Sequence, residues 1–119
     1  MQTAKIVNKT KNVVLAERAK IANNPWTRMR GLLGSAGLAE GEGLIIKPCN
    51  SIHTFFMKFS IDVIFLDKNM KVIKIANSLK SWRSFESLMN GRIAIELPSG
   101  KLNITNTKLD DFIDIICPA

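Results

Sequence analysis

The sequence predicts a mainly β domain, a small sandwich or a jelly-roll-like, partly open barrel with one or two short helices. Three observations predict it. Several short apolar runs follow one another closely, with turn residues between them. Only one segment has clear helical spacing. The chain has 119 residues, of which 46% are hydrophobic and 23% charged, which is typical of a globular domain with one core. We therefore expect residues 1–119 to form a single domain.

Two strands are expected first, at residues 3–8 and 13–21, on either side of a turn at residues 9–12. In the second run, apolar and charged side chains alternate along the chain, which is typical of a strand with one buried face. The predicted buried face consists of Val13, Leu15, Ala19 and Ile21.

A short amphipathic helix is predicted over residues 25–33. Asn24 suits the N-cap position, and Pro25 suits the first helical position. Trp26 and two later apolar residues recur at helical spacing, so we expect Trp26 to pack onto the sheet. The glycines of residues 34–43 match no phosphate-binding pattern, and turns that need positive φ explain them better.

The central part of the chain is predicted to be strands at residues 43–47, 51–57, 62–66 and 71–76. The run at 62–66 is apolar on both faces, so it should be a central strand that is covered on both sides. Residues 67–70 then form a hairpin turn, which makes the last two of these strands neighbours.

The C-terminal part begins with a longer excursion at residues 77–91. Residues 92–97 follow as a strand, in which Ile93, Ile95 and Leu97 should point inward while Glu96 points outward to pair with a nearby base. Residues 98–100 break this strand, and residues 112–116 form the last one.

The net charge is +7, and most of the excess lies in residues 1–30. A nucleic-acid partner is one interpretation, and a solvated strand face is the other, since no nucleic-acid motif accompanies the charge. The first interpretation requires one continuous basic face, formed by Lys5, Lys9, Lys11, Arg18 and Lys20. No apolar run has the length of a membrane helix or a signal peptide, and two cysteines make no disulfide framework. We therefore expect a cytoplasmic protein with no membrane partner.

Four motifs occur in a characteristic order along the chain. They are residues 29–33 (Met-Arg-Gly-Leu-Leu), 41–46 (Gly-Glu-Gly-Leu-Ile-Ile), 54–58 (Thr-Phe-Phe-Met-Lys) running into 61–67 (Ile-Asp-Val-Ile-Phe-Leu-Asp), and 95–100 (Ile-Glu-Leu-Pro-Ser-Gly). In this order and spacing the chain resembles the bacterial and archaeal family known as domain of unknown function 192, over residues 3–115. The resemblance implies a compact, mostly β domain with short helices, and it implies no established activity, cofactor or catalytic residue.

Cys49 and His53, the only histidine, could form a nucleophile and its base, or part of a zinc site with Cys117. The nucleophile would also need an orienting group and an oxyanion hole, and zinc would need further ligands. A partly buried cysteine and a hydrogen-bonded histidine are the structural alternative. We expect no cofactor, no metal and no catalytic residue, and Cys49 should not be a nucleophile because only Lys47 provides a nearby positive charge.

A ligand-binding site is predicted from His53, Lys58, Trp82 and Arg83. Trp and Arg are the residue types most enriched at binding hot spots, and Arg can hold an anion with two parallel hydrogen bonds. Hairpin geometry places the 58–61 turn and the start of the 77–91 excursion at the end opposite the 67–70 turn.

Three functions follow as hypotheses: a non-enzymatic binding module for an anionic or peptide ligand, a small metal-dependent or Cys/His hydrolytic enzyme, and a basic nucleic-acid adaptor. The first is favoured. Asp62, in contrast to Lys58, should serve the structure by accepting backbone N–H groups.

Overall fold

The computed structural model describes residues 3–22, 38–47, 52–53, 60–79, 84–85 and 91–118. These residues contain nine strands and one short helix. The strands are β1 (Thr3–Asn8), β2 (Val13–Ala22), β3 (Glu42–Ile46), β4 (Ile52–His53), β5 (Ile61–Leu66), β6 (Val72–Leu79), β7 (Ser84–Phe85), β8 (Ile93–Pro98) and β9 (Ile113–Ile116), and the helix is α2 (Lys101–Ile104). The predicted mainly β class with a barrel-like sheet is confirmed.

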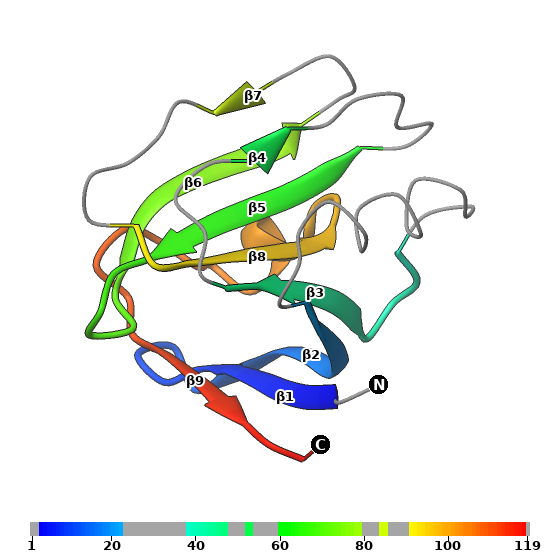
Figure 1. Cartoon of the computed structure of the whole chain (residues 1–119), viewed down its shortest axis with the longest axis vertical. Helices are drawn as coiled ribbons and strands as arrows, with labels where there is room; N and C mark the ends of the chain where they lie inside the picture. Colours follow the sequence, from blue (N-terminus) through cyan, green and yellow to red (C-terminus); the bar gives the residue numbers. More distant parts are fainter. Residues whose placement is uncertain are drawn as a thin grey trace.

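Seven strands form one curled sheet in the order β6-β5-β8-β3-β2-β1-β9, while β4 and β7 form a separate two-stranded ladder. Figure 1 shows the sheet running from β6 near the top of the view to β9 at the bottom. A single bridge between Lys71 and Phe112 connects the segments that precede β6 and β9. The backbone N–H of Ile113 also donates to the Met70 carbonyl oxygen, and that of Val72 donates to the Asp111 carbonyl oxygen. The two ends of the curled half-barrel therefore meet along these segments.

The β1–β2 hairpin confirms both predicted strands and most of the predicted buried face of the second. Leu15, Ala19 and Ile21 are buried as predicted, and Val13 is half-buried. Ile6 pairs with Ala16 and Val7 with Val14, with irregularities on either side of Ile6. The backbone N–H groups of Glu17 and Arg18 both donate to the Gly41 carbonyl oxygen, at 2.9 Å each. Two residues that share one acceptor form a β-bulge, which shifts the alternation of side chains. As a result, Ala16 is buried beside Leu15.

The middle of the chain follows the prediction closely. All six residues of β5 are buried, as expected for a strand that is covered on both faces. The hairpin turn is confirmed, because both Asn69 and Lys71 donate their backbone N–H to the Asp67 carboxylate at its start. β6 runs three residues further than predicted, to Leu79.

The main core lies on the α2 side of the sheet. Ile45, Ile95 and Ile64 pair across β3, β8 and β5, and all three are fully buried. Leu102 of α2 packs against the same cluster. Each such buried aliphatic side chain contributes on the order of 2 kcal/mol to stability. The short helix α2 was not predicted, since four residues carry no periodicity that could reveal it.

Some predicted elements lie outside the described residues. These are the helix at residues 25–33 with Trp26, and most of the strand at 51–57, of which Ile52–His53 are described. The last strand begins at Ile113, one residue later than predicted. In the part of the chain that the structure describes, no helix has the length and apolarity needed to cross a membrane.

Candidate functional site

The open end of the β5–β6 hairpin is formed by three strands in register. Ile61 pairs with Leu79 of β6 and with Pro98 of β8. This end, which we call the rim, lies opposite the 67–70 turn, as hairpin geometry predicts. Ser78 and Ser99 also lie there, with their hydroxyl oxygens 2.6 Å apart. The rim thus carries exposed hydrogen-bonding groups.

The β4–β7 ladder brings together two segments that the sequence analysis linked. Ile52 pairs with Phe85 and His53 with Ser84, so the backbone of His53 lies beside the residue that follows Arg83 in the sequence. Of the four predicted site residues, the structure describes only the backbone of His53. Lys58, Trp82 and Arg83 lie outside the described residues.

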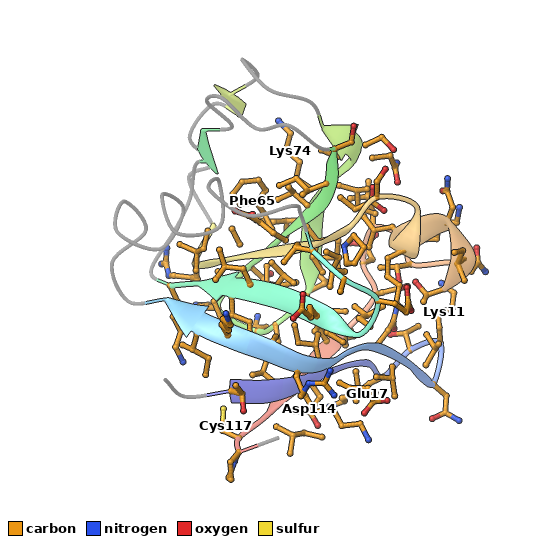
Figure 2. All side chains as sticks on the ribbon, turned by 90° about the vertical axis from the view of Figure 1, so that its right-hand side faces the viewer. Lys11, Glu17, Phe65, Lys74, Asp114 and Cys117 are labelled. Carbon is orange, nitrogen blue, oxygen red and sulfur yellow. The ribbon has the colours of Figure 1, made fainter. Side chains whose placement is uncertain are left out.

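The central strands have two different faces. Asp62 bonds to the backbone of α2, so Asp62 and its register partner Leu97 lie on the α2 side. Because side chains alternate along a strand, Val63 and its register partner Glu96 lie on the other side. Figures 1 and 2 both place β4 and β7 on the side of the central strands away from α2.

We call this side the second face. In Figure 2, Phe65 of β5 and Lys74 of β6 both point toward it. Its buried residues come from β3, β5 and β8 and are Leu44, Ile46, Ile61, Val63, Phe65, Ala94 and Glu96.

Glu96 is the buried acidic group of the second face, and the expectation that it points outward to pair with a base is wrong. Glu96 is only 3% exposed to solvent. Its register neighbours are Leu44 on β3 and Val63 on β5. Among the described residues, its Oε2 atom has no hydrogen-bond partner. Burial raises the pKa of Glu96 to about 8, because the low-dielectric surroundings disfavour the charged form.

The error at Glu96 has a physical cause. Strict alternation in residues 92–97 predicts one solvated face, yet Ala94 is as buried as Ile95. The signal that could have corrected this lies in the neighbouring strands. The runs at 43–46 and 61–66 contain apolar residues of both parities, which indicates a sheet covered on both sides.

Asp62 has the structural role predicted for it. Its Oδ1 accepts the Ser78 backbone N–H at 2.8 Å, and its Oδ2 accepts the Gly100 and Leu102 N–H groups at 3.1 and 3.0 Å. The residue is fully buried. Three backbone donors compensate its lost hydration, so Asp62 joins β5 to the end of β6 and to the start of α2.

Asp111 forms a third acidic site, between the N-terminal hairpin and the C-terminal segment. The Asn8 amide donates to it at 2.9 Å, the Lys108 backbone N–H at 3.0 Å, and the Lys11 ammonium at 3.0 Å. Burial by itself raises the pKa of Asp111, but these hydrogen bonds and the Lys11 charge outweigh it and leave the pKa below its ordinary value. This network serves the structure.

The Cys/His and zinc hypotheses involve residues that the structure describes only in part. Cys117 is an exposed free cysteine, and Cys49 lies outside the described residues. Within the described ranges, no group of three or more His, Cys, Asp and Glu side chains is arranged to hold a metal ion.

The basic N-terminal quarter is divided between different environments. Lys11 is engaged with Asp111, whereas Arg18 and Lys20 are exposed on β2. Acidic groups lie among them, because Glu17 precedes Arg18 in the bulge and the exposed Asp114 pairs with Val7 of β1 (Figure 2). The charges of these strands are therefore mixed.

Comparisons with known proteins agree with this fold. The profile of the DUF192 family, described as "Uncharacterized ACR", matches residues 6–115. A UPF0127 protein of Thermococcus sibiricus is 34% identical over 113 residues, which cover 92% of this chain and 73% of the relative. A UPF0127 protein of Pyrococcus horikoshii is 38% identical over 98 residues, which cover 80% of this chain and 84% of the relative.

A crystal structure of a protein of unknown function from Novosphingobium aromaticivorans has the same fold. It superposes with a TM-score of 0.78 over 94% of this chain and 83% of that chain, at 17% sequence identity. The family match covers nearly the whole half-barrel, from β1 to β9. The chain therefore belongs to the DUF192 family.

Proposed function

We propose that this protein is a non-enzymatic binding module that holds a small anionic or peptide ligand at the rim. In this proposal His53, Lys58, Trp82 and Arg83 contact the ligand. The carrying observation is the pairing of His53 with Ser84, which joins the segment before β5 to the segment after β6. Both segments start from the same end of the β5–β6 hairpin, because Ile61 pairs with Leu79.

The chemistry of the four residues supports a ligand with negative charge. An Arg guanidinium binds a carboxylate or phosphate through two parallel hydrogen bonds, and a Lys ammonium adds a mobile positive charge. A Trp ring supplies apolar contact area beside them. The exposed hydroxyls of Ser78 and Ser99 offer further hydrogen bonds at the same rim.

A thermal-shift and calorimetric screen tests the proposal with inorganic phosphate, small carboxylates and short peptides. We expect at least one of these probes to raise the melting temperature of the native protein. Arg83→Ala and Lys58→Ala should each weaken that binding by about tenfold or more, as expected for loss of a charged hydrogen bond.

The chain offers a matched control for each variant. Arg92 is exposed and precedes β8, at the opposite end of the sheet from the rim, because Ile93 pairs with Leu66. Lys68 lies in the 67–70 turn at that same far end. Arg92→Ala and Lys68→Ala should leave affinity unchanged. If Arg83→Ala and Lys58→Ala bind the ligand as tightly as these two controls, the ligand site lies elsewhere on the molecule.

A further inference from the structure

Glu96 differs from the other buried carboxyl groups that the structure describes, because they accept hydrogen bonds and its Oε2 does not. Asp62 accepts three backbone N–H groups, and Asp111 accepts from two side chains and one backbone N–H. Glu96, by contrast, leaves Oε2 without a partner within the described ranges. A buried polar atom without a partner costs about 1–3 kcal/mol, so this oxygen requires an explanation.

The position of Glu96 relates it to the rim. Glu96 lies two residues before Pro98 on β8, which is about 7 Å along the strand. It faces the side of the sheet on which β4 and β7 lie, away from α2. Leu44 and Val63 flank it in register, and both are buried. Glu96 is thus a polar group among the buried residues of the second face, two residues from the rim.

From this geometry we infer that Glu96 hydrogen-bonds to a neutral amide group of the ligand, so that the rim and the second face together bind a peptide. The inference rests on the proposed function and selects the peptide from its two ligand classes.

Hydrogen-bond complementarity selects the amide. A protonated carboxyl group has one O–H donor and one carbonyl acceptor, and an amide presents the matching carbonyl acceptor and N–H donor. The apolar neighbours that keep Glu96 protonated at neutral pH also disfavour a charged ligand group at this depth. The ligand's negative charge then stays at the rim, while its inner part is neutral.

Other charged groups on the second face lie away from the register neighbours of Glu96. Lys20 of β2 is the register partner of Leu44 and is exposed. Lys74 of β6 is the register partner of Phe65, so β5 lies between Lys74 and Glu96. The other charged residues on this side of the described strands are Lys5, Arg18, Glu42 and Asp114, with Arg92 just before β8. The charges that the described strands carry on this side therefore sum to a positive value, which disfavours an amine ligand.

The test uses the whole protein and a pooled library of N-acetylated tripeptides with free carboxylates, with octanoate and octylamine as probes lacking an amide. Binding is measured by calorimetry at pH about 6.5 and about 9.5, on either side of the Glu96 pKa. We expect the peptides to bind the native protein at the lower pH, and their affinity to fall about tenfold for each pH unit above 8 as the donor proton is lost.

Two substitutions separate the donor from the charge. Glu96→Gln keeps one donor and one acceptor but does not titrate, so its affinity should stay within about threefold of the native value at both pH values. Glu96→Leu removes both groups and should weaken peptide binding by about tenfold. Glu17→Gln, an exposed substitution in the β2 bulge, serves as the control and should change neither quantity.

Several results would overturn the inference. They are an absence of peptide binding to the native protein, equal binding by Glu96→Leu, a pH dependence that persists in Glu96→Gln, and tighter binding of octylamine with rising pH. Anion binding that requires Arg83 but ignores Glu96 would leave the proposed function standing and remove the inference alone. Peptide binding that requires Glu96 but ignores Arg83 and Lys58 would remove the proposed rim site, and with it the joint site of rim and second face, and would leave only the contact to Glu96.

Discussion

Glu96 and Asp111 show how the same functional group acquires opposite properties from its neighbours. Both are nearly buried. Glu96 has apolar register neighbours, and burial raises its pKa to about 8. Asp111 is also penalised by burial, yet hydrogen bonds from Asn8 and Lys108 and the charge of Lys11 bring its pKa below the ordinary value. The two carboxyls therefore affect stability at opposite ends of the pH scale.

We expect the free energy of unfolding to decrease between pH 4.5 and about 8 because of Glu96. The folded state binds the Glu96 proton more tightly than the unfolded chain, so this stabilisation is complete below the unfolded pKa and is lost as pH rises through the folded pKa. The total is on the order of several kcal/mol. Urea denaturation of native protein and Glu96→Gln across this range should show the decrease in the native protein only. Parallel stability curves would mean that Glu96 ionises freely.

Asp111 should set the acid limit of stability. Its folded pKa lies below the ordinary value of 3.8, so its contribution is present above that pH and is lost as pH falls through the folded pKa. Asp111→Asn should lower the free energy of unfolding by about 2–3 kcal/mol at neutral pH, because Asn8 and Lys11 lose a charged acceptor. The difference should shrink in acid.

Asp110→Asn provides the neighbouring control for this prediction. Its side chain is 81% exposed and lies 3.8 Å from the Lys71 ammonium. An exposed pair of this kind contributes little, so the substitution should be nearly neutral at every pH. A loss equal to that of Asp111→Asn would contradict the assignment of the buried network.

Residue-scale features were only partly predictable from the sequence. Asp62 was predicted to accept backbone N–H groups because it follows a turn motif, and it does. Glu96 was misplaced because its own strand alternates, while its burial depends on what covers the neighbouring strands. Asn8 and Asp111, which are hydrogen-bonded to each other, lie about a hundred positions apart in the sequence. No local pattern links two residues so far apart.

At the scale of elements, Asp62 holds three of them together, and its substitution should loosen all three. Asp62→Asn replaces an acceptor oxygen by an NH₂ group that faces backbone N–H donors. We expect a loss of about 3 kcal/mol in the free energy of unfolding. In hydrogen exchange, the substitution should speed up exchange of the Ser78, Gly100 and Leu102 amides relative to the native protein. Exchange of the β1 amides should change less.

Asp67→Asn is the matched control for this element. Asp67 also accepts two backbone N–H groups, but in the half-exposed 67–70 turn, where water can replace it. Its loss should be about 1 kcal/mol. Equal losses in the two variants would show that the Asp62 bonds add nothing beyond those of a surface turn.

Element boundaries followed from the sequence where hairpin turns punctuate the chain, and failed where the backbone is irregular. The 67–70 turn and its two strands were predicted because turn residues separate apolar runs. The bulge at Glu17 and Arg18 was not, because it depends on the Gly41 carbonyl, which arrives from a distant segment. Four residues of α2 depend on Asp62 in the same way.

For the whole molecule, the class was predictable and the strand order was not. The close spacing of short apolar runs predicted a barrel-like β domain, and the seven-stranded sheet confirms it. Two features of the order leave no trace in local patterns: β2 runs parallel to β3, and β1 lies between β2 and β9. Both unite segments far apart in the sequence, and their pairing depends on the shape of the complete sheet.

The pairing of β1 with β9 has a consequence for how the protein is made. Ribosomes release a chain from its N-terminus onward, so β1 emerges about a hundred residues before its second neighbour, β9. Until then one edge of the β1–β2 hairpin presents unpaired backbone groups, and Asn8 lacks Asp111. The nascent chain thus carries an unpaired edge on β1 until residues 113–116 emerge, and β9 then covers this edge and completes the described sheet (Figure 1).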